Sequence, residues 1–543
     1  MKASDTWPPS PADSAGSVIT VTGAGGVFPE KANSTKCNGI NSSADSARHG
    51  ELQRQLSGRH LNFIAIGGTI GTGFFLSTGT ALVKAGPAGC LISYIFVGTM
   101  LWSVMVCLAE MATYIPTAGA FSAYATRFVD PSLGFAVGWL YWFGWATTYA
   151  LSLTASGLII QYWNRSANIG ILIAVFWVVF TLVNYLPVGI YGELEMWLSS
   201  LKVITIIGFI IFAICVAAGV GREGVLGFKY WHDPGPFNEH LTSGGTGKFV
   251  GFWAVIIQAA VAYQGAELVG VGAGEARDPR KTVPSAIKVT FWGIISLFVV
   301  TIWLMGMIVP SNDPNLLSGS SDASASPLVI AAQRAGVRAL PDIINAVLLT
   351  AVLSAANSNV YSGSRVLLAL AEEGQAPAVL KRTNRRGIPT VAVAVTAAFG
   401  LLGFLNLSAE GGKVFNWLLN ISAVAGLTTW GSTCLSHLCF MRALKAQGIP
   451  RSELPYTSRF QPYTAIYGLF FSILVALTQG FTVFIEWNTS DFFAAYISLI
   501  LFGVLWVGHK LWYRQSAVRP AEADLARGCY GSHGKQSAID GGV

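Results

Sequence analysis

Ionisable residues stand inside long apolar stretches of this sequence, among them Glu110, Lys202 and Glu267. A charged side chain at the centre of a lipid bilayer costs at least about 2.5 to 3.5 kcal/mol, so such residues tend to be functional or paired. Glu267 ends the polar interruption Ala262-Tyr263-Gln264-Gly265-Ala266-Glu267. This carboxylate could carry a proton, or it could brace an unwound stretch of chain by hydrogen bonding. For Glu110, Arg365 and His437 we favour structural roles.

A glycine-rich stretch near the start of the first long apolar segment predicts a binding site. It reads Gly67-Gly68-Thr69-Ile70-Gly71-Thr72-Gly73. In hydrocarbon every backbone N–H and C=O must be paired, so an interrupted helix is tolerated only where its freed groups face protein or a water-filled cavity. A half-helix starting near Gly73 would present free N–H groups and a positive dipole end, which suit an α-carboxylate at Gly71, Thr72 and Gly73.

The interruption before Glu267 has the opposite polarity. A half-helix that ends near Gly265 would offer unpaired carbonyls to an ammonium group. If the two breaks meet near the bilayer midplane, their natural ligand is a zwitterion. The alternative is that these glycines only allow close packing of helices.

Composition sets the class of the protein. The 543 residues are 52% hydrophobic and 11% charged, against roughly 25% charged in ordinary soluble domains. Twelve apolar runs are about long enough to cross roughly 30 Å of hydrocarbon. They are Leu61 to Val83, Cys90 to Ile115, Leu133 to Trp163, Ile169 to Leu186, Met196 to Val220, Phe249 to Gly272, Val289 to Val309, Leu340 to Ala371, Ile388 to Leu405, Phe415 to Met441, Tyr463 to Phe484 and Phe492 to Trp512.

These spans predict an all-α integral membrane protein with four parts. Residues 1–58 are rich in Ser, Gly, Asn, Ala and Pro and lack an apolar signal core, so we expect a disordered tail. Residues 59–445 would form a ten-helix core, a five-plus-five inverted repeat in which helices 1 and 6 are broken. Residues 446–514 would hold helices 11 and 12, and residues 515–543 a second tail. Lys and Arg are more frequent in the loops that share a side with the tails, which predicts that both termini are cytoplasmic.

Several other classes of protein are disfavoured. The net charge of +7 reads as an orientation signal and does not indicate nucleic-acid binding. The glycine motif at Gly68 lies within an apolar helix, and Gly244-Gly245-Thr246-Gly247-Lys248 lacks the Ser or Thr of a phosphate loop, so we expect no nucleotide cofactor. The seven cysteines show no disulfide or metal spacing. No grouped nucleophile, base and orienting residue indicates an enzyme.

Several motifs resemble those of fungal amino acid permeases, in the amino acid-polyamine-organocation superfamily. The run from Arg59 to Phe74 resembles the first-helix signature, and the passage from Ala85 to Glu110 with Pro116 resembles the permease signature in its spacing. Further resemblances are Glu275-Ala276-Arg277-Asp278-Pro279-Arg280-Lys281, Asn357-Ser358-Asn359 and Gly363-Ser364-Arg365. The resemblance spans roughly Arg54 to Trp512.

The resemblance implies a twelve-helix transporter that works by alternating access and is usually driven by protons. Its glycine-rich first helix would hold the substrate carboxylate at Thr69, Ile70, Gly71, Thr72 and Gly73. The sixth helix would bind the amine through its carbonyls at Gln264 and Gly265.

The resemblance also suggests individual roles. Tyr263 is the candidate aromatic gate, and Glu267 resembles a carboxylate linked to protonation. Lys202 lies where some bacterial relatives place an ammonium in a sodium-site position, although packing or snorkelling at a helix end explains it equally well.

Substrate choice depends on few positions. Many fungal permeases carry a glutamate in the third helix, and the matching position here is Ser152. Without that charge a cationic side chain would lose hydration with less compensation, so we expect neutral or broad-range amino acids. Thr148, Ser152 and Ser156 fall on one helix face and could line the pocket, or could serve helix packing.

The leading hypothesis is therefore an amino acid importer of the plasma membrane, coupled to protons. A non-transporting amino acid sensor on the same scaffold and a carrier of polyamines or carnitine remain open. Amino acid, protons and the lipid bilayer are the expected partners.

Overall fold

The computed structural model describes residues 58–117, 119–273, 279–317, 326–407, 411–485 and 487–525. The regular elements in these ranges are helices, and nine of the described helical segments are long and apolar enough to cross a membrane. The two predicted tails lie mostly outside the described residues, as do Glu275 to Asp278.

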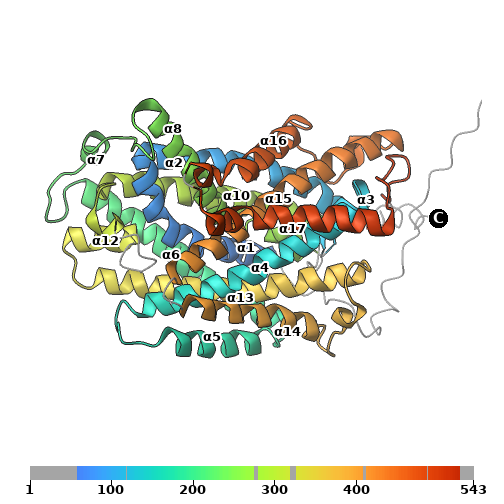
Figure 1. The fold of residues 1–543 in the computed structure, drawn as a ribbon, viewed down its shortest axis with the longest axis horizontal. Coiled ribbons are helices and arrows are strands. Elements are labelled where there is room, and N and C mark those ends of the chain that lie inside the picture. The colour runs from blue at the N-terminus through green and yellow to red at the C-terminus, as the bar shows by residue number, and fades with distance from the viewer. Residues whose placement is uncertain are drawn as a thin grey trace, which may run out of the picture. The chain divides into compact units, whose positions relative to one another are not determined.

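The helices follow one another along the chain, and most of them are labelled in Figure 1. They are α1 (Gly58–Thr69), α2 (Thr72–Tyr114), α3 (Ala120–Phe128), α4 (Pro131–Ile160), α5 (Ile169–Val183), α6 (Val188–Ala217), α7 (Lys229–His232), α8 (Gly244–Tyr263), α9 (Leu268–Gly272), α10 (Pro279–Ile308), α11 (Pro314–Leu317), α12 (Pro327–Ala335), α13 (Leu340–Glu372), α14 (Thr390–Phe399), α15 (Gly411–Ala446), α16 (Tyr463–Thr478) and α17 (Thr489–Tyr513), with 3-10 turns η3 (Ala378–Lys381), η4 (Gly400–Leu407), η5 (Arg451–Glu453) and η6 (Phe481–Phe484).

The first two predicted spans are divided differently in the structure. A single helical segment, α2, runs from the second half of the first span through the second, with a change of direction at Gly86, whose φ is 73°. The loop at residues 236–238 pairs the backbone freed there, because Asn238 N–H donates to Ala85 O at 3.1 Å and Ala88 N–H donates to Pro236 O at 2.9 Å. A side chain at Gly86 would collide with that loop, since an added Cβ would lie 2.8 Å from Asn238 N.

The fifth predicted span also begins elsewhere. It was expected from Met196, whereas α6 begins at Val188. The two glutamates in this first part, Glu193 and Glu195, lower its apolar character, yet Glu195 is completely buried. An ion pair within α6 to the equally buried Lys202 accounts for this burial.

Both predicted helix interruptions are present. The first helix ends at Thr69 and the next begins at Thr72, with Gly71 extended at φ −146° and ψ −151°. The second interruption separates α8 from α9 and contains Gly265 at φ 102°. Only glycine adopts this φ readily, because it lacks the Cβ that other residues carry.

The two interruptions touch each other directly. A Cβ added at Gly265 would lie 2.6 Å from the carbonyl oxygen of Gly68 and 2.8 Å from Thr69 N. Likewise, a Cβ at Gly73 would lie 2.9 Å from Val261 O. Glycine at these positions therefore allows two backbones to approach more closely than side chains would permit.

Long helices surround this junction. The α13 helix packs along α4, which also contacts α15, while α2 packs on α8 and α10, and α1 packs on α6. In Figure 1 the shorter α5 and α14 follow α13 along one edge, whereas α16 and α17 lie beside α15.

We predict that Gly265→Ala destabilises the protein. The positive φ costs about 1–3 kcal/mol in a residue with a side chain, and the overlap with Gly68 adds about 1–3 kcal/mol. The thermal unfolding temperature of the purified protein in detergent should therefore fall. The matched control is Gly293→Ala on α10, where an added Cβ meets nothing within 4 Å. Equal unfolding temperatures for the two variants would contradict the close approach of the two breaks.

Candidate substrate pocket

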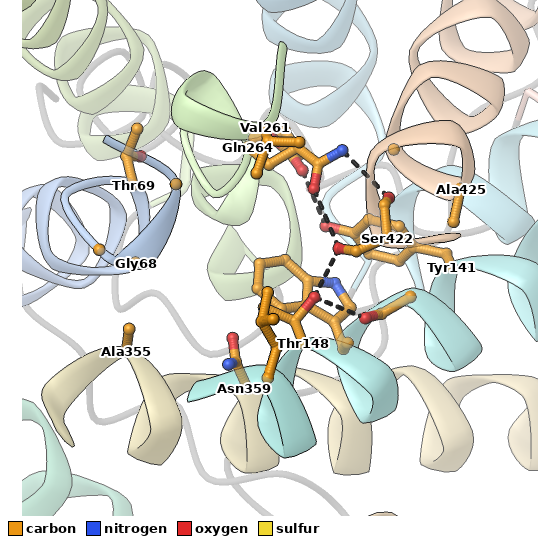
Figure 2. Close-up of a pocket in the computed structure, with 17 residues that line it drawn as sticks. Gly68, Thr69, Tyr141, Thr148, Val261, Gln264, Ala355, Asn359, Ser422 and Ala425 are labelled. Carbon is orange, nitrogen blue, oxygen red and sulfur yellow. Dashed lines mark hydrogen bonds between the residues drawn. The ribbon is translucent and has the colours of Figure 1, made fainter. Parts of the chain in front are cut away.

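A pocket lies where the two interruptions meet (Figure 2). Its walls come from the α1–α2 break, the α8–α9 break and the facing sides of α4, α13 and α15. The lining residues are Gly68, Thr69, Gly71, Gly73, Tyr141, Gly144, Trp145, Thr148, Leu151, Val261, Gln264, Glu267, Ala355, Asn359, Ser422, Ala425 and Gly426.

One end of the pocket faces the start of α2. The first N–H groups of a helix have no partner within it and carry the positive end of its dipole. Gly71 precedes the first turn and Gly73 belongs to it, and both line the pocket. This end can bind an anionic group such as a carboxylate.

A polar chain crosses the opposite wall. Gln264 Nε2 donates to the carbonyls of Ser422 at 3.1 Å and Ala423 at 3.0 Å, and Ser422 Oγ donates to Gln264 Oε1 at 3.3 Å. The hydroxyls of Ser422 and Thr148 lie 2.5 Å apart. Figure 2 shows Gln264, Ser422 and Thr148 linked in this order. This series of hydrogen bonds connects the α8–α9 break to α15 and α4.

Glu267 is the single formally charged side chain among the lining residues. It is completely buried. Its Oε2 accepts from Gly265 N–H at 3.1 Å, and its Oε1 accepts from the Tyr141 hydroxyl at 3.3 Å. The carboxylate therefore pairs a backbone N–H group of the α8–α9 break and also connects this break to α4 through Tyr141.

Lys202 lies near the middle of α6, so snorkelling at a helix end does not account for it. Its side chain is completely buried. The Nζ donates to the carbonyl of Gly67, in the last turn of α1, at 2.6 Å. Lys202 thus holds the end of α1 just before the first break, outside the pocket lining.

The predicted site residues divide into two groups. Thr69, Gly71, Gly73, Gln264 and Glu267 line the pocket. Outside the lining are Ile70, Ser152, Tyr263, Gly265 and Lys202. The backbone of Thr72 begins α2, and its side chain is not among those described.

Three of the residues outside the lining have contacts or backbone geometry that define their positions. Ser152 is buried and accepts a hydrogen bond from Asn359 Nδ2 at 3.2 Å, so it reaches the pocket through Asn359. Tyr263 is fully buried, with ring centroids 5.2 Å from Phe298 and 6.0 Å from Tyr94. Gly265 supplies the turn that brings Gln264 and Glu267 to the pocket.

Sequence reasoning did not assign Tyr141, Trp145 or Ser422 to the site. Tyr141 and Trp145 lie one helical turn apart on α4. Both are on the same face of the helix as Thr148. That spacing was a usable signal once Thr148 had been singled out. Ser422 gives no such signal, because serines in membrane helices usually bond to their own helix backbone.

A separate buried cluster of charged groups connects α2 to later parts of the chain. Glu110 Oε2 lies 2.8 Å from His437 Nε2, and Glu110 Oε1 accepts from Arg451 at 2.7 Å and from Ser458 N–H at 2.6 Å. The contacts join α2 to α15 and to the segment before α16. They agree with the structural role expected for Glu110 and His437.

Comparisons with known proteins agree with this architecture. The family described as amino acid permease matches residues 60–520. The chain is 46% identical to a lysine/arginine permease of Candida albicans, over 87% of this chain and 83% of that one. It is 44% identical to a lysine-specific permease of Saccharomyces cerevisiae (88% and 78% covered) and 42% identical to a dicarboxylic amino acid permease of the same yeast (87% and 79% covered).

A solved structure has a similar fold. It is a manganese transporter from Eremococcus coleocola, which is 12% identical in sequence and superposes with a TM-score of 0.51 over 86% of this chain and 97% of that one. At this identity the similarity concerns the arrangement of helices alone.

We predict that Thr148→Val weakens amino acid binding. The substitution keeps the shape of the side chain and removes the hydroxyl that meets Ser422, a loss of about 0.5–1.5 kcal/mol, or up to roughly tenfold in Kd. Binding of a labelled amino acid mixture to purified protein measures it. The control is Thr147→Val, because Thr147 is buried next to it and, within the described part of the chain, its hydroxyl donates only to carbonyls of α4. Equal losses in both variants would contradict a role for the pocket wall.

Proposed function

Because this chain belongs to the amino acid permease family, we propose that it imports amino acids across the plasma membrane as a proton symporter with alternating access. The observation that carries the proposal is the contact between two helix interruptions, Gly68–Thr69 and Gly265, beside a pocket. Such a junction offers N–H groups at one side and a carboxylate with carbonyls at the other, which suits a zwitterion.

The proposed architecture has twelve crossings, with both termini in the cytoplasm. Residues 59–445 form the transport core, residues 446–514 the last two helices, and the tails are 1–58 and 515–543. The two breaks would occupy corresponding positions of a five-plus-five inverted repeat, as the positions of broken helices in transporters of this type suggest. The excess of Lys and Arg in the proposed inner loops supports the orientation.

In the pocket we assign the substrate carboxylate to the segment Thr69 to Gly73, at the start of α2. The amine would lie near Gln264 and Gly265, within reach of the Glu267 carboxylate. Ser152 would act indirectly, by holding Asn359 at 3.2 Å. Tyr263 would act as a gate from the buried aromatic group that it forms with Phe298 and Tyr94.

The proposed proton site in the pocket is Glu267. A buried carboxylate beside the substrate can change its hydrogen bonds to Gly265 N–H and Tyr141 when it gains a proton. Substrate and proton would then act on the same break in the chain. Lys202 would take part by holding the end of α1 at Gly67.

We further propose neutral or broad-range substrates. Glu267 is the one carboxylate of the lining, and it is engaged in bracing the α8–α9 break. A second negative charge for a cationic side chain is absent from the lining residues that the structure describes. The rest of that wall carries hydroxyl, amide and aromatic groups, which suit uncharged side chains.

A second candidate is the import of basic amino acids. It is favoured by the identity of 46% to a lysine/arginine permease. In that case Glu267 would have to compensate the positive charge of the substrate's side chain as well as that of its α-ammonium group. The two candidates differ in whether lysine and arginine compete with neutral amino acids.

The test of function is uptake of a labelled amino acid mixture into proteoliposomes holding the full chain. The proposal expects saturable accumulation that disappears when the pH gradient is collapsed. Competition by each common amino acid, at two pH values, then ranks neutral, basic and acidic substrates. Binding without accumulation would indicate a sensor, and competition by compounds without an α-carboxylate would indicate a polyamine or carnitine carrier.

We predict that Glu267→Gln separates substrate binding from proton coupling. Glutamine keeps a carbonyl oxygen that can accept from Gly265 N–H or Tyr141, but it cannot take up a proton. Binding of the amino acid should persist, while the dependence of uptake on external pH should be lost. The measurement is the initial uptake rate across a series of external pH values. An unchanged pH profile would remove Glu267 from the proton pathway.

A further inference from the structure

A second buried polar cluster lies outside the pocket lining, where α1, α6 and α13 meet. Its two ionisable members, Glu195 and Lys202, both come from α6 and are completely buried. The remaining members are Ser199 of α6, Ser354 of α13 and the carbonyl of Gly67 on α1.

The two oxygens of Glu195 have different surroundings. Oε1 accepts from Ser354 Oγ at 2.5 Å and lies 3.8 Å from Lys202 Nζ. The single proton of the Ser199 hydroxyl has two acceptors, the carbonyl of Phe63 on α1 at 2.9 Å and Glu195 Oε1 at 3.2 Å. Oε2 is buried and has no hydrogen-bond partner among the described residues. Lys202 directs its short hydrogen bond, 2.6 Å, to Gly67 O rather than to the carboxylate.

A buried carboxylate oxygen without a hydrogen-bond partner is unusual. Buried polar atoms are nearly always hydrogen-bonded, and each exception calls for an explanation. A carboxylate whose single purpose was to balance Lys202 would be expected to use both oxygens, because its desolvation is costly. The open Oε2 is a place where a proton can attach without displacing any existing hydrogen bond.

We propose that Glu195 is a second proton site of this transporter, with Oε2 as the atom that takes up the proton. The inference rests on the proposed proton symport, which supplies the proton. One O–H bond forms at Oε2, and the carboxylate becomes a neutral carboxyl group while Lys202 stays cationic. The charge that balances Lys202 is then gone, and Lys202 is left with the Gly67 carbonyl as its main partner.

The location of the cluster gives this step a consequence for transport. Gly67 directly precedes Gly68 and Thr69, which line the pocket and touch Gly265. A Cβ added at Gly67 would lie 2.2 Å from Glu195 Oε1, so the end of α1 rests directly on the carboxylate. Protonation of Glu195 therefore changes the electrostatic attachment of the half-helix that borders the substrate.

Other charged and titratable residues lie on the helices that pack on α6. The helices packed on α6 include α1, α10 and α13. The charged and titratable residues of these three helices are Arg59 and His60 on α1, Arg280, Lys281 and Lys288 on α10, and Asp342, Tyr361, Arg365 and Glu372 on α13.

Several of these residues have identified contacts that do not involve Glu195. Arg59 pairs with Glu193 at 2.8 Å, Arg365 lies over the ring of Tyr361 at 3.8 Å, and Lys288 lies over the ring of Tyr456. Within the described residues, Lys202 is the cation that pairs with Glu195.

The experiment compares two transport modes in proteoliposomes holding the full chain. The probe is an equimolar mixture of the common radiolabelled amino acids. Exchange against unlabelled mixture inside, without a pH gradient, reports substrate binding and the movement of the loaded carrier. Accumulation driven by an inward proton gradient reports coupling.

For Glu195→Gln we expect exchange to persist and gradient-driven accumulation to be lost. Glutamine can still accept from Ser354 and Ser199, so a bracing role alone would leave accumulation intact. Retained accumulation with a wild-type pH profile would overturn the inference. The matched control is Glu193→Gln, two residues away on α6, where the carboxylate forms an exposed ion pair; it should accumulate like the wild type.

A measurement on the unmodified protein covers the case in which Glu195→Gln does not reach the membrane. A hydrophobic carbodiimide reacts with protonated carboxyl groups in apolar surroundings, and peptide mass spectrometry locates the modified residue. We expect modification of Glu195 that declines as the pH rises. A protein that is unmodified at Glu195 at every pH would overturn the inference.

The outcome for the unmodified protein separates the two proposals. If it shows no gradient-driven accumulation, proton symport itself is wrong. If it accumulates amino acids and Glu195→Gln does so equally, proton symport stands and the role of Glu195 alone is wrong.

Discussion

The structure depends on the requirement that backbone polar groups inside a membrane find partners. Two helices are interrupted in this chain, and each interruption exposes N–H and C=O groups that a continuous helix would pair. The chain places the two interruptions against each other, with Gly265 in contact with the backbone of Gly68 and Thr69. Groups left over at this junction face a small pocket. The two breaks therefore border one pocket, and we propose that the substrate is bound there.

Long uninterrupted helices hold the junction in position. The α4 and α13 helices pack along each other, and α15 crosses to the second break through Gln264 and Ser422. There is a physical reason why continuous helices position the interrupted ones. Breaks are locally unstable, so their geometry must be fixed by neighbours that keep their own hydrogen bonds. Tyr141 and Thr148 on α4 are such fixed points, each in contact with a group at or beside the pocket.

The sequence predicted the breaks and most spans, because glycine runs and long apolar segments act through local chemistry. Gly71, Gly73 and Glu267 were singled out from the sequence, and all three line the pocket. The start of α6 was misplaced because Glu195 interrupts the apolar pattern, and an ion pair to Lys202 explains its burial. The wall formed by Ser422 was not predictable. The helix face of Thr148 could be read from the sequence, but nothing in the sequence pairs its hydroxyl with Ser422 of α15.

Two buried carboxylates act on the same junction from different sides. Glu267 closes the α8–α9 break through Gly265 N–H, and Glu195 with Lys202 holds the last turn of α1. Each is attached to backbone that borders the pocket, and Gly68 and Gly265 are in contact between them. A change in either charge therefore alters the balance of forces at one contact. In the proposed binding mode the substrate's own carboxylate and ammonium would lie at that contact, so binding of the substrate and the charge state of the two glutamates would be physically linked.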